Sequence, residues 1–205
     1  MGRQSSVARR QQILAAAAPL FARHGFHGVS VDDLGAATGI SGPALYRHFR
    51  AKEDILAELL LGVSRTLLDG GLQRRRRAAE PGEALDALVA WHVTFALDNA
   101  DVISVQEREL ANLPERARRE VRSLQSRYVD VWAEVVHAVN GCGRPTADAA
   151  VRAALALMSS TPRPAQLPRR EIEGLLHAMA VTSLRAAAVA PGATAPAGRG
   201  VRRAG

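Results

Sequence analysis

The 205-residue chain lacks several patterns that would assign it to other classes of protein. Cys142 is the only cysteine, which excludes an intrachain disulfide and fits a protein of the reducing cytoplasm. No apolar run approaches the roughly 20 residues of a membrane-spanning helix. The apolar segment 13–20 is too short for a signal peptide and is interrupted by Pro19. We therefore expect a cytoplasmic protein with no membrane segment.

Patterns typical of catalysis and metal binding are missing as well. The chain has no glycine-rich phosphate loop. Residues 39–42, GISG, resemble half of a nucleophile elbow, but Pro43 replaces the final glycine and no strand precedes it. His24 and His27 stand without the further ligands that a zinc site needs. We expect no enzymatic activity, no metal and no cofactor.

The composition that is present favours a helical, DNA-binding protein. Apolar residues make up 47% of the chain, with alanine and leucine dominant and strand-forming residues few, so we expect an all-α fold. The net charge is +7. The first 52 residues hold seven cations against only Asp32 and Asp33, and this local excess favours a polyanionic partner. These cations are Arg3, Arg9, Arg10, Arg23, Arg47, Arg50 and Lys52.

Residues 31–52 predict two short helices joined by a tight turn. Ser30 and Asp33 have the spacing of a capping box, and Gly39 supplies the turn. Ser41 is expected to cap a second helix, from 42 to about 49, with Pro43 in its first turn. Leu45 and Phe49 share one face of that helix, and small, hydroxyl and cationic side chains occupy the other face. Such an outer face suits a DNA groove, although a plain helical hairpin has the same pattern.

Three strings of this region are similar to the DNA-binding signature of the TetR/AcrR family of transcriptional regulators. They are LFARHGF at 20–26, SVDDLGAATGIS at 30–41 and ALYRHFRAKEDIL at 44–56. The resemblance implies a three-helix helix-turn-helix DNA-binding domain, residues 1–54, and a larger helical ligand-binding and dimerisation domain, residues 55–190. The Pro/Gly/Ala/Arg-rich tail 191–205 is expected to be disordered.

Periodicity and helix breakers predict nine helices in that order. Residues 1–6 are expected to form a disordered arm, and 74–77 to form a charged link or a phosphate-attracting rim. The expected helices are 7–24, 31–38, 42–49, 52–70, 83–99, 101–110, 114–140, 146–159 with Thr146 as its cap, and 169–189.

The resemblance also implies which residues contact double-stranded operator DNA. The residues expected nearest the bases are Ser41, Gly42, Pro43, Ala44 and Leu45. Tyr46, His48 and Lys52 are expected to reach phosphates. Because few of these residues can read a base with two hydrogen bonds, base reading is left between Arg47 and apolar contacts. Lys52 also stands at a helix N-terminus, which favours an anion. Ser30 and Thr38 are candidate phosphate donors, with an equal case that they only satisfy the local backbone.

A ligand cavity is expected in the larger domain. Candidate lining residues are Trp91, His92, Phe95, Gln106, Glu107, Arg108, Tyr128 and Trp132. Both tryptophans fall on helices that enclose the ligand cavity in the family. An aromatic stripe is also typical of a plain core, and His92 fits a hydrogen-bonded core histidine better than a ligand group.

The nature of the ligand is left between two alternatives. Residues 105–132 are similar to family members associated with fatty-acid and acyl-CoA metabolism. An apolar cavity with a cationic rim would suit acyl-CoA, whereas a purely hydrophobic ligand with the arginines merely solvated is an equal alternative. The arginines in question are Arg74 to Arg77, Arg108, Arg116, Arg118, Arg119 and Arg122.

Small and apolar side chains along the last two helices predict a homodimer with a four-helix interface. They are Ala149, Ala150, Ala153, Ala154, Leu157, Ile172, Leu175, Leu176, Met179, Ser183 and Leu184. We therefore expect a dimeric repressor that a small-molecule effector releases from a palindromic operator. The alternatives are an activator, a nucleoid-type binder, or a helical carrier or enzyme with an incidental helix-turn-helix.

Overall fold

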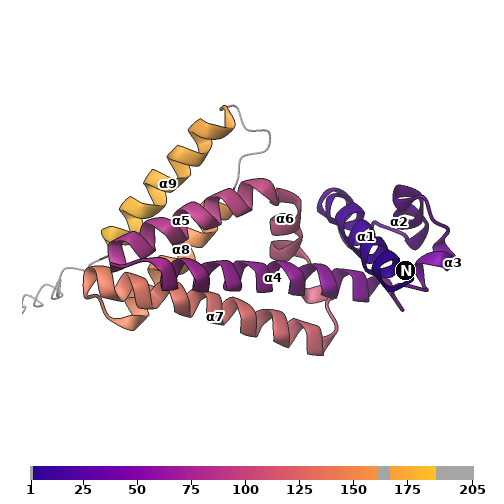
Figure 1. The fold of residues 1–205 in the computed structure, drawn as a ribbon, viewed down its shortest axis with the longest axis horizontal. Coiled ribbons are helices and arrows are strands. Elements are labelled where there is room, and N and C mark those ends of the chain that lie inside the picture. The colour runs from indigo at the N-terminus through magenta and orange to yellow at the C-terminus, as the bar shows by residue number, and fades with distance from the viewer. Residues whose placement is uncertain (1, 161–166, 188–205) are drawn as a thin grey trace, which may run out of the picture.

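The computed structural model describes residues 2–160 and 167–187, and within these ranges every regular element is a helix. The all-α prediction is thereby confirmed for the described residues. Helices α1, α2 and α3 cluster at one end of the molecule, while α4 runs from them along most of the molecule's length beside α7 (Figure 1). The elements are α1 (Gly2–His24), α2 (Val31–Thr38), α3 (Gly42–Leu45), α4 (Lys52–Arg77), α5 (Pro81–Asp98), α6 (Ala100–Arg108), the 3-10 helix η1 (Leu110–Asn112), α7 (Glu115–Asn140), α8 (Arg144–Ser159) and α9 (Arg169–Arg185).

Two separate hydrophobic clusters hold these helices together. The N-terminal core joins α1, α2 and α3 to the first turns of α4, through side chains such as Phe21, Leu34, Leu45 and Leu56. The C-terminal core joins the rest of α4 to α5, α7, α8 and α9.

Three helices contribute to both cores. Helix α7 supplies Val121 to the N-terminal core and Leu124, about one turn later, to the C-terminal core. Helix α4 supplies Leu60 to the N-terminal core and Val63, one turn later, to the C-terminal core. Helix α6 supplies Val105 to the N-terminal core and Ile103 to the C-terminal core. The two ends of the molecule are therefore packed on shared helices and not on a loose linker.

Several predicted helix boundaries are wrong. Helix α1 begins at Gly2 and continues through Pro19, so the expected N-terminal arm belongs to the helix. Helix α3 spans only Gly42–Leu45, and the expected continuation to Phe49 is a series of turns. Helix α9 ends at Arg185, before the expected position 189. The predicted disorder of 191–205 concerns residues outside the described ranges.

Helix α4 also outruns its expected end at residue 70 and includes the basic run Arg74 to Arg77. Gly70 and Gly71 do not interrupt it, because the rings of Trp91 and Tyr128 occupy the space where their Cβ atoms would lie, at 2.3 and 2.7 Å. The basic run then suits the negative end of the helix dipole.

Helices α5 and α8 each begin with a proline in the first turn. Helices α5 and α8 begin two residues before their predicted starts, because Pro81 and Pro145 fit the first helical turn, where an N–H is not needed. Gly143 occupies the N-cap position of α8, so the prediction of Thr146 as its cap is wrong.

The predicted caps in the helix-turn-helix region are confirmed except at Ser41. Ser30 and Asp33 form the reciprocal capping box, and Gly39 ends α2 in the left-handed region with φ of 67°. Ser41 stands at the N-cap position of α3, but its side chain makes no capping hydrogen bond. Its hydroxyl is exposed, so this group is free to face a partner.

Helices α8 and α9 each have an inner and an outer face. Ala154, Ile172, Leu176 and Leu184 from the predicted dimer surface are buried in the C-terminal core of the chain itself. Leu175 and Met179 lie on the outer face of α9, with 49% and 45% of their surface exposed. Only the outer set is free for another chain, because a helix at the edge of a bundle buries one stripe in its own core.

Candidate nucleic-acid interface and internal cavity

Helix α3 and the turn that follows it present a mixed face. Pro43, Tyr46 and Arg47 are exposed, and Ala44 and His48 are half-buried. Leu45 has no exposed surface and packs in the N-terminal core, so the prediction of a base-facing Leu45 side chain is not supported. Gly42 is buried because α2 approaches closely, with Asp32 Oδ1 only 2.5 Å from where a Cβ would stand.

The hydroxyl groups of Ser30 and Thr38 are used within the protein. Ser30 Oγ donates to Asp33 Oδ2 at 2.6 Å and accepts from the Asp33 backbone N–H at 3.1 Å. The bonds from the Ser30 side chain and backbone lower the pKa of Asp33. Thr38 Oγ1 donates to Leu34 O at 2.8 Å. Each hydroxyl has one proton, so this arrangement favours the local backbone role left open by the sequence.

Lys52, the only lysine of the sequence, turns inward. Its Nζ donates to the carbonyl oxygens of Phe26 and Val29 at 2.8 and 2.6 Å and lies 4.3 Å from the centroid of the Phe26 ring. A compact ammonium with three rotatable donors suits this pair of carbonyls better than a planar guanidinium. The Lys52 amine therefore fastens the α1–α2 loop to α4, and the sequence prediction of a phosphate contact missed this role.

Arg10 connects the end of the α3 region to α4. Its guanidinium donates to His48 O and to the Glu58 carboxylate, and stacks 4.1 Å from the centroid of the Phe49 ring. From the sequence, Arg10 counted only as positive charge, because its partners lie 38 and 48 residues away. Arg10 thus ties the outward face of α3 to the helix that links both cores.

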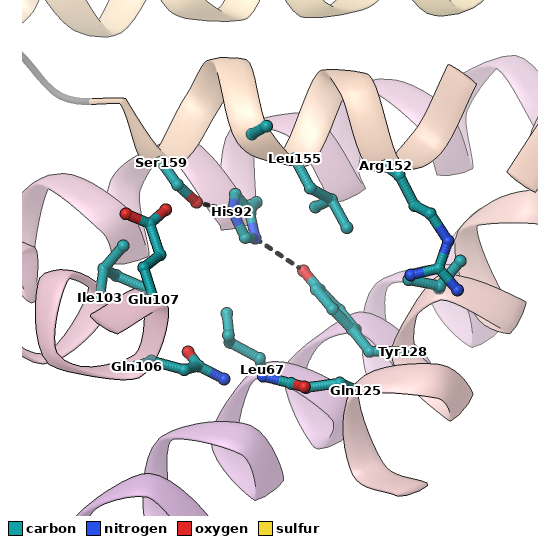
Figure 2. Close-up of a pocket in the computed structure, with 12 residues that line it drawn as sticks. Leu67, His92, Ile103, Gln106, Glu107, Gln125, Tyr128, Arg152, Leu155 and Ser159 are labelled. Carbon is teal, nitrogen blue, oxygen red and sulfur yellow. Dashed lines mark hydrogen bonds between the residues drawn. The ribbon is translucent and has the colours of Figure 1, made fainter. Parts of the chain in front are cut away.

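A cavity of about 400 Å³ lies among α4, α5, α6, α7 and α8 (Figure 2). His92, Gln106, Glu107 and Tyr128 line it, as the sequence suggested. Eight further lining residues were not predicted, because α8 was assigned only to the dimer surface and apolar residues have no distinctive signal. They are Leu67, Ile103, Gln125, Val129, Arg152, Leu155, Ala156 and Ser159.

The other four predicted ligand residues lie outside the cavity lining. Trp132 is fully buried in the C-terminal core, and Phe95 is buried beside Trp91. The Trp91 ring lies against Gly70 and under the guanidinium of Arg74, 4.0 Å from its Cζ. Arg108 donates to Ala22 O of α1, and so joins α6 to the N-terminal core.

The predicted cationic rim is not assembled around the cavity. Arg75 pairs with Glu134 at 2.7 Å, and Arg118 and Arg119 pair with Glu115. Arg152 is the one cation among the lining residues, and it makes no ion pair with the described part of the chain. Arg152 and Glu107 are both exposed, so they mark the mouth of the cavity.

A hydrogen-bonded chain crosses the inner wall. His92 Nδ1 lies 3.2 Å from the Tyr128 hydroxyl, and Nε2 lies 3.4 Å from Ser159 Oγ. Burial lowers the pKa of His92 to about 4 and raises the pKa of Tyr128. Both side chains are therefore neutral at pH 7. His92 is a hydrogen-bonded core histidine and a cavity residue at once.

Within the described ranges no helix is long and apolar enough to cross a membrane. The same residues contain no cluster of three or more His, Cys, Asp or Glu side chains arranged to hold a metal ion.

Two family models match the sequence. Residues 13–59 match the model of the bacterial regulatory proteins of the tetR family, and residues 78–163 match a tetracyclin repressor-like C-terminal domain. The first match covers the helix-turn-helix, and the second covers most of the helices that line the cavity.

Individual relatives agree with these models. The HTH-type transcriptional repressor KstR2 of Mycolicibacterium smegmatis is 31% identical over 145 residues, which are 68% of this chain and 70% of that protein. The solved structure of the regulator PfmR from Thermus thermophilus is 26% identical with a TM-score of 0.72, over 83% of this chain and 97% of PfmR. A structure of AibR with isovaleryl coenzyme A and operator DNA is 22% identical with a TM-score of 0.71, over the same shares.

The Arg10 contacts predict an effect on DNA binding without a phosphate contact. Because Arg10 holds the carbonyl of His48, Arg10→Ala should lower the affinity for specific DNA by roughly fivefold, or about 1 kcal/mol for a partly exposed ion pair. The slope of log affinity against log salt should stay at its wild-type value. Fluorescence anisotropy over a salt series measures both quantities.

Arg144→Ala is the matched control, because Arg144 also forms ion pairs but at the far end of α7 and α8. That variant should bind DNA as the wild type does. A salt slope reduced by about one in Arg10→Ala would show that Arg10 itself contacts a phosphate, and would contradict the clamp role.

The buried imidazole predicts a dependence of stability on pH. Unfolded His92 takes up a proton near its ordinary pKa of about 6.5, whereas the native side chain does so only near 4. The unfolded state therefore binds the proton first, and stability falls as the pH falls through this window. Between pH 7 and 5 this histidine should remove about 2 kcal/mol from the free energy of unfolding. Urea unfolding of wild type and His92→Gln should show a flatter pH profile in the variant; parallel profiles would contradict a buried neutral His92.

Proposed function

We propose that this protein is a ligand-responsive repressor. The chain belongs to the tetR family of bacterial regulatory proteins, and it is therefore a DNA-binding transcriptional regulator. In this proposal a homodimer binds a palindromic operator through the α2–α3 region, which we define as residues 31–50. A small molecule in the cavity among α4 to α8 shifts the dimer away from the DNA-binding shape. The boundaries 1–54 and 55–190 and the cytoplasmic location belong to the same proposal.

The exposed groups of the α2–α3 region support the DNA contact. The Ser41 hydroxyl makes no capping hydrogen bond to α3, and Tyr46, Arg47 and Arg50 are exposed within the next nine residues. Neither Arg47 nor Arg50 has an ion-pair partner among the described residues, so both cations are available to phosphates or bases. Ser30, Thr38 and Lys52 already have partners, which leaves Ser41, Tyr46, Arg47, His48 and Arg50 as the proposed contact set.

The outer face of α9 supports the homodimer. Of the five large apolar side chains that the described residues expose, Leu175 and Met179 are on α9 and Leu167 directly precedes it. Small residues of α8, among them Ala149 and Ala153, are exposed as well. Exposed apolar groups gathered on one helix mark an interaction surface, and two-fold association of identical chains is the most common way to cover one.

The cavity supports an acyl-CoA effector of limited chain length. At roughly 30 Å³ for each water-sized group, about 400 Å³ holds about a dozen such groups, enough for a medium acyl chain and its thioester but not for a nucleotide. The nucleotide would then lie outside the mouth, where Arg152 has no ion-pair partner among the residues that the structure describes. The AibR structure, which shares this fold, contains isovaleryl coenzyme A together with operator DNA.

The dimer proposal predicts different outcomes for two adjacent leucines. Leu175→Arg adds a charge to the exposed face of α9 and should give folded monomers with weak operator binding. Leu176 is 6% exposed and packs in the C-terminal core, so Leu176→Arg should instead unfold the chain. Light scattering, thermal unfolding and operator binding separate the two. A Leu175→Arg dimer with wild-type operator affinity would contradict this interface.

The effector proposal predicts release of operator by acyl-CoA. Chains of roughly six to eight carbons should release best, since each buried CH₂ adds about 0.8 kcal/mol until the cavity is full. Arg152→Ala should weaken release. Arg116→Ala/Arg119→Ala should not, because these side chains lie on α7 about two turns or more before the cavity residue Gln125. Titration of the protein–operator complex measures this; no release at any chain length would rule out this effector class.

A further inference from the structure

Three helices contribute one polar side chain each to the inner wall of the cavity. His92 comes from α5, Tyr128 from α7 and Ser159 from α8 (Figure 2). The imidazole stands between the two hydroxyl groups and bonds to both, at 3.2 and 3.4 Å. The Tyr128 ring is held from behind, because it packs on Gly71 and stacks against the His92 ring. The Tyr128 hydroxyl therefore has a fixed position.

The number of protons on these three hydrogen-bonded side chains determines whether a donor remains for a ligand. A neutral imidazole has one N–H, and each hydroxyl has one O–H, so the three groups have three donor protons. Two hydrogen bonds within the chain use two of them. If Nδ1–H donates to Tyr128, the Ser159 O–H donates to Nε2 and the Tyr128 proton remains. If the other tautomer is present, the Ser159 proton remains. Either tautomer leaves one hydroxyl donor for the cavity.

The surrounding groups determine what that donor can bind. The Gln106 amide donates one of its two N–H groups to Ser64 Oγ at 3.2 Å, and the amide of half-buried Gln125 also lines the cavity. The charged lining residues Glu107 and Arg152 are exposed at the mouth, while Leu67, Ile103 and Leu155 give the wall its apolar surface. A buried carboxylate would need a cation or several donors to offset its lost hydration. A neutral hydroxyl donor on the inner wall, with the one lining cation, Arg152, exposed at the mouth, fits a neutral oxygen acceptor.

We infer that the Tyr128–His92–Ser159 chain recognises the uncharged carbonyl oxygen of the effector, which for the proposed acyl-CoA is the thioester oxygen. This inference rests on the proposed function and names the group by which the cavity distinguishes a thioester from a free acid. His92 is a positioning residue that sets which hydroxyl donates. Tyr128 or Ser159 is the residue that touches the ligand.

A pair of probes that differ only in the acceptor tests the inference. Hexanoyl-CoA has the thioester carbonyl, and S-hexyl-CoA has the same chain length and nucleotide with a methylene in its place. Isothermal titration of the full-length protein should give about tenfold tighter binding of hexanoyl-CoA, the size of one net hydrogen bond. In Tyr128→Phe or in Ser159→Ala this preference should fall to about unity, through loss of hexanoyl-CoA affinity with S-hexyl-CoA unchanged.

Ser160→Ala is the matched control, because Ser160 is adjacent but its exposed hydroxyl donates to Leu157 O. It should keep the wild-type preference. An infrared readout with 1-¹³C-hexanoyl-CoA adds a signal that packing alone does not move: the thioester carbonyl band should shift to lower frequency on binding wild type and not on binding the sensitive variant. The Ser159 variant keeps the test decisive if Tyr128→Phe folds poorly.

Each outcome separates the inference from the proposed function. Equal binding of the two probes by the wild type, with release of operator by both, would overturn the inference and leave the effector proposal standing. A wild-type preference retained in both Tyr128→Phe and Ser159→Ala would also overturn it. Binding of neither probe would contradict the acyl-CoA proposal and the inference together.

Discussion

The burial of α4 in two hydrophobic cores constrains the rest of the structure. Leu60 and Val63 are one turn apart, yet the first packs with the helix-turn-helix and the second with the cavity helices. A helix is stiff over this length, so a tilt of its C-terminal half is carried to its N-terminal half. The α2–α3 region follows α4, because Lys52 holds the Phe26 and Val29 carbonyls and Arg10 joins His48 to Glu58.

Helix α6 adds a second connection between cavity and DNA-binding end. Gln106 and Glu107 line the cavity, and the next residue, Arg108, donates to Ala22 O of α1. Val105 is fully buried in the N-terminal core while Ile103 lines the cavity. The Tyr128 ring also touches α4 directly at Gly71. A ligand that moves α6 or Tyr128 therefore acts on α4 and α6, two of the cavity helices that also enter the N-terminal core. These helices form the two-state element that a ligand-controlled regulator requires.

The sequence predicted the parts of this architecture that depend on local chemistry. The capping box of Ser30 and Asp33, the turn at Gly39 and the helix ends at residues 24 and 140 each follow from a few adjacent residues. The motif strings identified the family, which the family models and relatives confirm. Helix ends were less accurate where tertiary packing decided them, as at Gly70 and Gly71, which would have ended an isolated helix but are covered by Trp91 and Tyr128.

The site residues were harder to predict, because their roles depend on partners distant in sequence. The sequence predicted a DNA phosphate contact for Lys52 and a ligand contact for Arg108, but both donate to backbone carbonyls 23 to 86 residues away. The two tryptophans lie on the expected helices, but Trp132 is buried in the C-terminal core and Trp91 packs half-buried against that core. Ser159 and Arg152 of α8 reach the cavity without any sequence signal. Periodicity indicates which face of a helix is buried, and it does not indicate whether the buried face meets a core or a cavity.

The most direct test of coupling is the reciprocity between the cavity and the operator-binding surface. If cavity occupancy and operator binding are coupled through α4 and α6, each must change the affinity of the other by the same factor. Hexanoyl-CoA affinity should be measured for the free dimer and for the dimer saturated with operator DNA. Coupling predicts that hexanoyl-CoA binds more weakly to the operator complex than to the free dimer. The factor should equal the one by which hexanoyl-CoA weakens operator binding. Equal affinity in the two states would contradict it, since a ligand that does not distinguish them cannot release the DNA.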